Sequence, residues 1–247
     1  MLFDHSIVDK ILKAIFPLPE RFGVIQFDDS FCDEGDFINQ KEIYQSLQEV
    51  SPETQIYFGI TKMVIISPEL PKVVIKIPFN GYYLINGQEY DEEGGDLLDH
   101  GDWLEFYRSP GSNISDYCLA EYEKYQQLKE QDLDCFVAKT LFYDTIDGVN
   151  VFIQEWVTPE KLSENIYKPS LKSKEKVTRL RDSYKELRLP DSNWMGICLD
   201  VYGEDKVKSF LSYCKKDPDI LYDCHKANYG YRLNDSPAIL DFSNFLE

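Results

Sequence analysis

The stretch that decides the fold is DCHKANYGYRLNDSPAILDFS, residues 223–243. It places the carboxylate of Asp223 and the amide of Asn228 five residues apart in a tight loop. Asp241 follows thirteen residues after Asn228, directly behind the apolar segment Ala-Ile-Leu. Two strands are predicted around YGYRLNDSPAILDF, because apolar and aromatic residues flank a cluster of Asn, Asp, Ser and Pro. Asp223, Asn228 and Asp241 are therefore set at fixed distances in sequence, with a predicted strand between the amide and the second carboxylate.

Such a set suits one kind of chemistry. One carboxylate can orient a hydroxyl and accept its proton, while an amide and a second carboxylate offer hard oxygen ligands to Mg²⁺. The stretch resembles the D-x-x-x-x-N catalytic loop and the DFG metal motif of the protein kinase-like superfamily, where an 18-residue step like that from Asp223 to Asp241 is common. This resemblance implies that Asp223 is catalytic, that Asn228 and Asp241 bind metal, and that ATP and Mg²⁺ are the cofactors.

The resemblance extends upstream. Residues 55–79, QIYFGITKMVIISPELPKVVIKIPF, predict three antiparallel strands with turns near 59–61 and 67–71. Val-Val-Ile-Lys, ending at Lys76, is similar to the V-A-I-K strand, which implies that Lys76 is catalytic and holds the α- and β-phosphates. In the same way Gly59 resembles a glycine of the Gly-rich loop, and Val64 resembles the valine above the adenine.

A helix is predicted over residues 115–130, with Ser115 as its N-cap. The resemblance implies that this helix supplies a glutamate to pair with Lys76, and both Glu121 and Glu123 qualify. Glu121 is preferred, because Tyr125 four residues later can pack inward. The predicted strands 136–144 and 150–157 are joined by a turn at Asp147-Gly148. They lead to a hinge, where backbone groups near Glu155 and Val157 would meet the adenine.

The expected fold is α+β, a bilobal protein kinase-like fold with an antiparallel-sheet N-lobe and a truncated, mostly helical C-lobe. We expect a helical extension over 1–50, an N-lobe over 51–157 with an acidic insertion at 81–113, and a minimal C-lobe over 158–247. The first helix is predicted over 6–16, with Ser6 as its cap and Ile7 on its apolar face. A basic helix over 172–188 is expected to be a solvated face, with docking of an acidic partner as the alternative.

Several departures from the family pattern limit what the resemblance implies. Only Gly59 remains of the Gly-rich loop, and DFG is replaced by DFS. His225 gives a D-x-H-x-x-N form, which is more similar to aminoglycoside and choline-type phosphotransferases. This histidine either holds the loop by hydrogen bonds or acts beside the γ-phosphate. The sequence ends four residues after Ser243, so no activation segment is expected.

The net charge of the sequence limits the kinds of partner that the protein can bind. The sequence has 44 acidic and 26 basic side chains and a formal net charge of −18, which repels phosphates and anionic lipids. We therefore expect no nucleic acid partner and no membrane association. The six cysteines are scattered without a C-x-x-C motif, and we expect reduced thiols and a cytoplasmic protein.

Three functions are compatible with these features. The first is a Mg-ATP-dependent kinase that transfers the γ-phosphate to a protein Ser or Thr hydroxyl. The second is a pseudokinase-like binding protein that sequesters a partner, suggested by the depleted Gly-rich loop. The third is a phosphotransferase acting on a small cationic acceptor, suggested by the D-x-H-x-x-N form and the acidic surface.

Overall fold

The structure, a computed structural model, is mixed α+β with seven α-helices and an antiparallel sheet among the residues that it describes. It describes residues 2–18, 23–27, 40–58, 61–85, 88–90, 104–110, 116–162, 168–222 and 224–242. Two predicted site residues, Gly59 and Asp223, lie outside these ranges. The chain divides into a sheet unit, Leu2–Cys118 with Phe142–Ile153, and a helical unit, Leu119–Leu141 with Gln154–Glu247. The α+β class is therefore confirmed.

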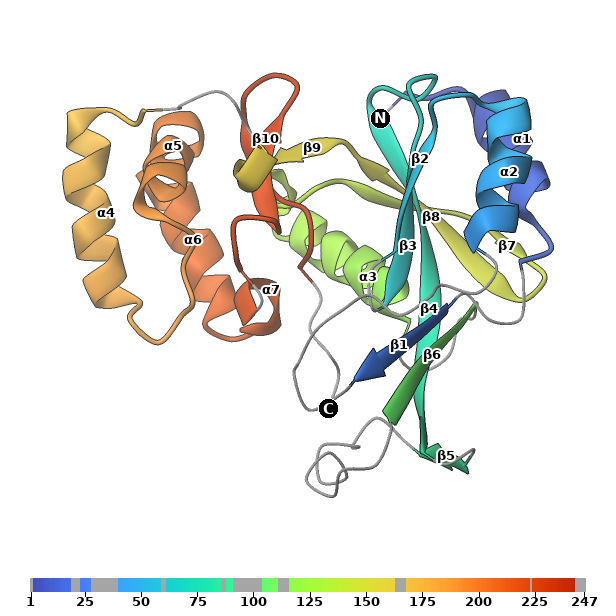
Figure 1. Ribbon diagram of the computed structural model, residues 1–247. Coiled ribbons are helices and arrows are strands. Elements are labelled where there is room, and N and C mark those ends of the chain that lie inside the picture. The colour runs from blue at the N-terminus through green and yellow to red at the C-terminus, as the bar shows by residue number, and fades with distance from the viewer. Residues whose placement is uncertain are drawn as a thin grey trace. The chain divides into compact units, whose positions relative to one another are not determined.

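The sheet unit consists of two helices and most of a large sheet (Figure 1). Its elements are α1 (His5–Ile15), β1 (Gly23–Phe27), α2 (Gln40–Val50), β2 (Gln55–Phe58), β3 (Lys62–Ile66), β4 (Val73–Ile85), β5 (Gln88–Tyr90), β6 (Leu104–Pro110) and parts of β7 (Thr140–Ile146) and β8 (Val149–Glu155). The strand order is β1-β6-β4-β3-β2, and β8 pairs with both β4 and β7. The three strands predicted over 55–79 are confirmed, with antiparallel β2–β3 and β3–β4 pairs.

Helix α1 forms because its apolar residues recur at helical spacing. Val8, Ile11, Leu12 and Ile15 make a stripe that is at most 4% exposed. Burying each such side chain stabilises the unit by about 1.5–3 kcal/mol. Asp4, rather than the predicted Ser6, caps the helix and accepts a hydrogen bond from the Ser6 N–H. The prediction for Ile7 was also wrong, because Val8 lies on the stripe and Ile7 is half-buried.

Two segments of the sheet unit contain strands that we did not expect. The 1–50 segment contains β1, which pairs with β6 inside the sheet unit. Its sequence GVIQF is rich in strand-forming residues, which explains why it joins the sheet. The predicted insertion at 81–113 contains the end of β4, then β5 and β6, and β4 pairs with β6 from Phe79↔Pro110 to Ile85↔Leu104. Aromatic and branched residues in both strands outweigh the acidic composition there.

The turn between β7 and β8 follows the predicted chemistry. Asp147 and Gly148 have φ values of 52° and 79°, the left-handed region that a two-residue hairpin turn requires. Gly148 has no other atom within 4 Å of where a Cβ would lie, so only its backbone conformation favours glycine.

The helical unit is built from helices and a small antiparallel sheet. Its elements are most of α3 (Tyr117–Glu130), the 3₁₀ turns η3 (Asp134–Phe136) and η4 (Glu160–Leu162), β9 (Val157–Pro159), α4 (Leu171–Ser183), α5 (Ser192–Tyr202), α6 (Glu204–Cys214), α7 (Asp219–Tyr222), β10 (Tyr229–Arg232) and β11 (Pro237–Ile239). The strands lie in the order β11-β10-β9. The hairpin predicted around YGYRLNDSPAILDF is confirmed as β10 and β11, paired from Tyr229↔Ile239 to Tyr231↔Pro237.

Large side chains from most of these elements fill one core. Trp194 of α5, Phe136 of η3, Phe210 of α6 and Phe242 after β11 are each at most 2% exposed. The rings of Phe136 and Phe210 stack with centroids 4.3 Å apart, and the Trp194 indole N–H donates to the Gly230 carbonyl at 3.0 Å. The C-terminal hairpin is therefore attached to the helices by both packing and a hydrogen bond.

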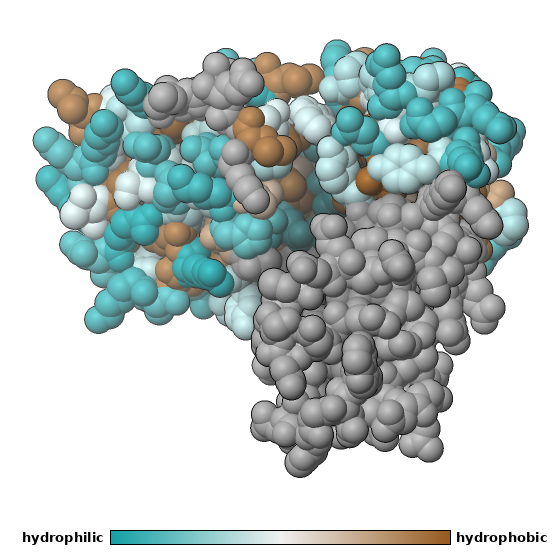
Figure 2. All heavy atoms as spheres, in the orientation of Figure 1, coloured by the Kyte–Doolittle hydropathy of each residue, from teal (hydrophilic) through white to brown (hydrophobic). Residues whose placement is uncertain are grey.

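The surface of the helical unit carries the exposed basic residues that the sequence predicts for the segment 172–188. On the face seen in Figure 2, the area over α4 to α6 is mostly hydrophilic. Lys172, Lys174 and Arg179 of α4 are exposed, as expected for a solvated basic helix. The five cysteines within the described ranges are free thiols, and most are buried. No helix in the described ranges is long and apolar enough to cross a membrane.

Candidate functional site

The hairpin β10–β11 brings Asn228 and Asp241 together. Asn228 immediately precedes β10, and Asp241 lies two residues beyond β11. The backbone N–H groups of Leu240 and Asp241 both approach the Asn228 carbonyl, at 2.9 and 3.4 Å. Asn228 is 8% exposed and Asp241 is half-buried. The backbones of Asn228 and Asp241 are therefore in contact, although thirteen residues separate the two positions in sequence.

The segment before Asn228 is held by its own hydrogen bonds. The Asn228 N–H donates to the His225 carbonyl at 2.8 Å, and the Ala227 N–H donates to Nδ1 of His225 at 3.2 Å. This contact agrees with the first of the two predicted roles of His225, holding the loop by hydrogen bonds. A role beside the γ-phosphate stays a prediction. Cys224 is 8% exposed and packs as a small apolar residue in the core of the helical unit.

Glu121 lies on the buried side of α3. It is 0% exposed, Tyr125 is 3% exposed, and Glu123 is exposed. We preferred Glu121 over Glu123 because Glu121 lies four residues before Tyr125, on the same helix face. The burial of both residues agrees with this preference. Gln154 of β8 lies 3.4 Å from the Glu121 carboxylate and 3.1 Å from the Thr140 hydroxyl. The predicted pairing of Glu121 with Lys76 joins residues of different units and stays a prediction.

Arg232 of β10 forms a buried hydrogen-bond centre that the sequence did not suggest. Its guanidinium donates to the Glu155 carboxylate at 2.9 Å, to the Tyr202 hydroxyl at 3.1 Å, and to three carbonyls at 2.7–3.1 Å, those of Cys135, Val137 and Pro237. Burial alone would lower the pKa of Arg232, but Glu155 and Tyr202 raise it overall. The network ties β8, η3, α5 and both hairpin strands together.

The same network bears on the predicted hinge. The Glu155 carboxylate is bound by Arg232, and the Glu155 N–H donates to the Lys139 carbonyl at 2.8 Å. Both groups are engaged within the helical unit, so the Glu155 N–H is not directed at a base. Val157 is 5% exposed and lies opposite Arg232 in the β9–β10 pair. Any adenine contact at this hinge would therefore use other backbone groups.

Lys76 and Val64 lie in the sheet unit. They are direct partners in the antiparallel β3–β4 pair, and Lys76 is only 3% exposed. A buried lysine is costly unless its ammonium group is partnered, and Lys76 does have an electrostatic or hydrogen-bonding partner. This burial sets Lys76 apart from a solvated surface lysine.

Two further carboxylates interact with tyrosines of β10. Asp191 caps α5 by accepting from the N–H groups of Asn193 and Trp194, and it also accepts from the Tyr229 hydroxyl at 3.1 Å. Glu160 of η4 has one buried oxygen, Oε2, without a hydrogen-bond partner. Burial, and then the charge of Asp191, raises the pKa of Glu160. Only the Asp191-Ser192 helix start could have been found from the sequence.

The residues present fit a magnesium ion held jointly with phosphates. Within the described ranges, no group of three or more His, Cys, Asp or Glu side chains could hold a metal ion. Mg²⁺ commonly takes only one or two protein ligands and completes its shell with phosphate and water oxygens. The pair Asn228 and Asp241 matches that requirement. No family model, curated protein or solved structure matches the chain.

Proposed function

We propose that this protein is a Mg-ATP-dependent kinase that phosphorylates Ser or Thr hydroxyls of a protein partner. In this proposal the fold is bilobal and kinase-like, with an N-lobe over 51–157 and a minimal C-lobe over 158–247. The observation that carries the proposal is the β10–β11 hairpin, which makes Asn228 and Asp241 neighbours at the spacing of a kinase metal site. The buried Lys76 on a central strand supports it independently.

Each residue then has a distinct role. Asp241 and Asn228 would bind Mg²⁺ together with the nucleotide phosphates, and Lys76 would neutralise charge on the α- and β-phosphates. Asp223 would accept the proton of the acceptor hydroxyl. Val64 and Gly59, together with backbone groups near Val157, would contact the nucleotide. Glu121 would position Lys76.

The binding-protein alternative has its own support. Only one glycine, Gly59, remains of the Gly-rich loop, so fewer close backbone contacts to phosphate are available. In this alternative the chain keeps nucleotide binding and lacks transfer. The small-molecule alternative rests on His225, but its Nδ1 already accepts from the Ala227 N–H, which favours a structural role.

Transfer of labelled phosphate from Mg-ATP, to the protein itself or to a Ser/Thr peptide library, tests the proposal. We expect transfer by the wild type and a loss of about 10²–10⁴ in Asp223→Asn, the usual range for a missing acid–base group. Asp182→Asn, at an exposed position on α4, serves as the matched control and should be unchanged. Transfer to aminoglycosides or amino alcohols alone would support the small-molecule alternative. Absence of transfer, with nucleotide binding intact, would support the binding protein.

A further inference from the structure

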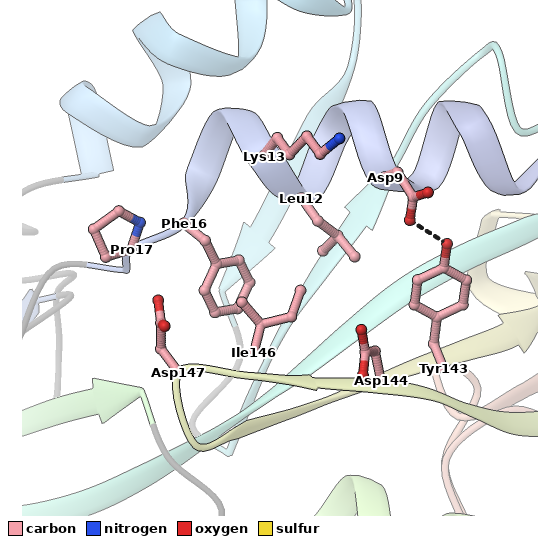
Figure 3. A pocket seen from close by; sticks show the side chains of 9 residues that line it. All are labelled: Asp9, Leu12, Lys13, Phe16, Pro17, Tyr143, Asp144, Ile146 and Asp147. Atoms are coloured by element: carbon pink, nitrogen blue, oxygen red, sulfur yellow. Dashed lines mark hydrogen bonds between the residues drawn. The ribbon is translucent and has the colours of Figure 1, made fainter.

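A pocket of about 470 Å³ opens between α1 and the β7–β8 hairpin of the sheet unit (Figure 3). Leu12 and Phe16 point from the helix toward the hairpin, and Ile146 points back toward them. Leu12 is 2% exposed, while Phe16 and Ile146 are half-buried. The pocket therefore has an apolar wall, and the buried Leu12 anchors the helix side of that wall in the core. Its size falls within the range of small-molecule sites in proteins.

The polar part of the lining is mostly acidic. It contains three carboxylates, those of Asp9, Asp144 and Asp147, and one ammonium group, that of Lys13. The formal charge of the lining is therefore −2. Figure 3 shows Asp144 and Asp147 on the hairpin side of the pocket, while Lys13 extends along α1 rather than toward the hairpin. The chain's net charge of −18 adds to the attraction for a cation.

Tyr143 fixes one end of the pocket. Its hydroxyl donates to the Asp9 carboxylate at 2.5 Å, and its ring stacks against His5 with centroids 5.6 Å apart. The Phe3 ring lies 4.6 Å from His5, so three aromatic side chains support this end. An aromatic ring beside carboxylates is a favourable surface for a cation.

We propose that this pocket binds a small organic cation, an amine or guanidine attached to an aryl or alkyl body. The apolar body would lie against Leu12, Phe16 and Ile146, and the charge would meet the Asp144 carboxylate near Tyr143. Asp147, at the other end of the pocket, would add to the attraction. A neutral molecule of the same shape lacks the charge attraction, and an anion is repelled. None of the lining residues belongs to the proposed phosphoryl-transfer set, so the two proposals succeed or fail separately.

Amide chemical shifts of the labelled full chain, titrated with 2-phenylethylamine, test this proposal. The neutral 2-phenylethanol and the anionic 3-phenylpropionate serve as matched probes. We expect saturable shifts for the amine in α1 and around Gly148, with a Kd roughly tenfold lower than that of the alcohol. The double variant Asp144→Asn/Asp147→Asn should remove this preference. Both positions are exposed, and asparagine tolerates the positive φ of residue 147, so folding should be retained.

Glu49→Gln, an exposed change on α2 outside the pocket, should leave the amine's affinity unchanged. Higher salt should weaken binding of the amine more than that of the alcohol. Equal affinity for the amine and the alcohol would overturn the proposal, as would saturable shifts only at residues outside α1 and the hairpin. The absence of any saturable shift with the amine would overturn it as well.

Discussion

Replacing Arg232 with methionine should strongly destabilise the helical unit. The change removes five hydrogen bonds, although the Tyr202 hydroxyl still donates to the Pro237 carbonyl and the Lys139 N–H to the Glu155 carboxylate. Breaking a buried ion pair by removing one partner costs about 3–5 kcal/mol. The Glu155 side chain is 29% exposed, so water offsets part of the loss, and the lower end, about 3 kcal/mol, is expected. That corresponds to a change of roughly 100-fold in the folded-to-unfolded ratio.

Urea unfolding followed by tryptophan fluorescence measures this loss, because Trp194 lies in the core of the helical unit. With a slope of about 1–3 kcal/mol per molar urea, the midpoint should fall by roughly 1–3 M. Arg179→Met, at an exposed position on α4, is the matched control and should lie within about 0.5 kcal/mol of the wild type. Equal midpoints for the Arg232→Met and Arg179→Met variants would refute the argument that the network holds the hairpin.

Three other substitutions test separate parts of the helical unit by the same unfolding measurement. Gly230→Ala would place a Cβ 1.8 Å from the Thr158 carbonyl oxygen, so it should destabilise more than Gly203→Ala, which meets no neighbouring atom and bears only the backbone strain of its φ of 83°; a smaller loss for Gly230→Ala would contradict the close β9–β10 approach. Asp191→Ala removes an N-cap and a Tyr229 contact, and a loss of about 1–2 kcal/mol is expected. Glu160 has a pKa raised above its ordinary 4.5, so its contribution is most favourable below pH 4.5 and is lost as pH rises through the folded-state pKa. Glu160→Gln should therefore be more stable than the wild type at pH 7, with an advantage that shrinks on acidification; an advantage independent of pH would count against this account.

Local patterns predicted much of the fold. The strands over 55–79, the Asp147-Gly148 turn and the C-terminal hairpin follow from strand-forming residues and turn chemistry, which act over a few neighbours. The joining of β1 to β6 could not be predicted, since it depends on pairing across about 80 residues. The acidic composition of residues 81–113 likewise obscured β6, although the aromatic residues of that strand favour a β conformation.

In the candidate site, too, some features follow from local sequence and others depend on the tertiary fold. The neighbouring positions of Asn228 and Asp241 follow from a short hairpin, so spacing alone was informative. The burial of Glu121 follows from helical periodicity. The role of Arg232 was not predictable, because its partners come from residues 135–137, 155, 202 and 237, which only the tertiary fold assembles.

The proposed function requires Asp241 to bind Mg²⁺ together with ATP. Calorimetric titration of ATP into the wild type and into Asp241→Asn, each with and without Mg²⁺, tests it most directly. We expect Mg²⁺ to increase the affinity of the wild type for ATP. The Asp241→Asn variant should remain folded and lose most of this increase in affinity. Binding of ATP that is equally tight in both proteins and indifferent to Mg²⁺, or no binding to the wild type, would contradict the claim.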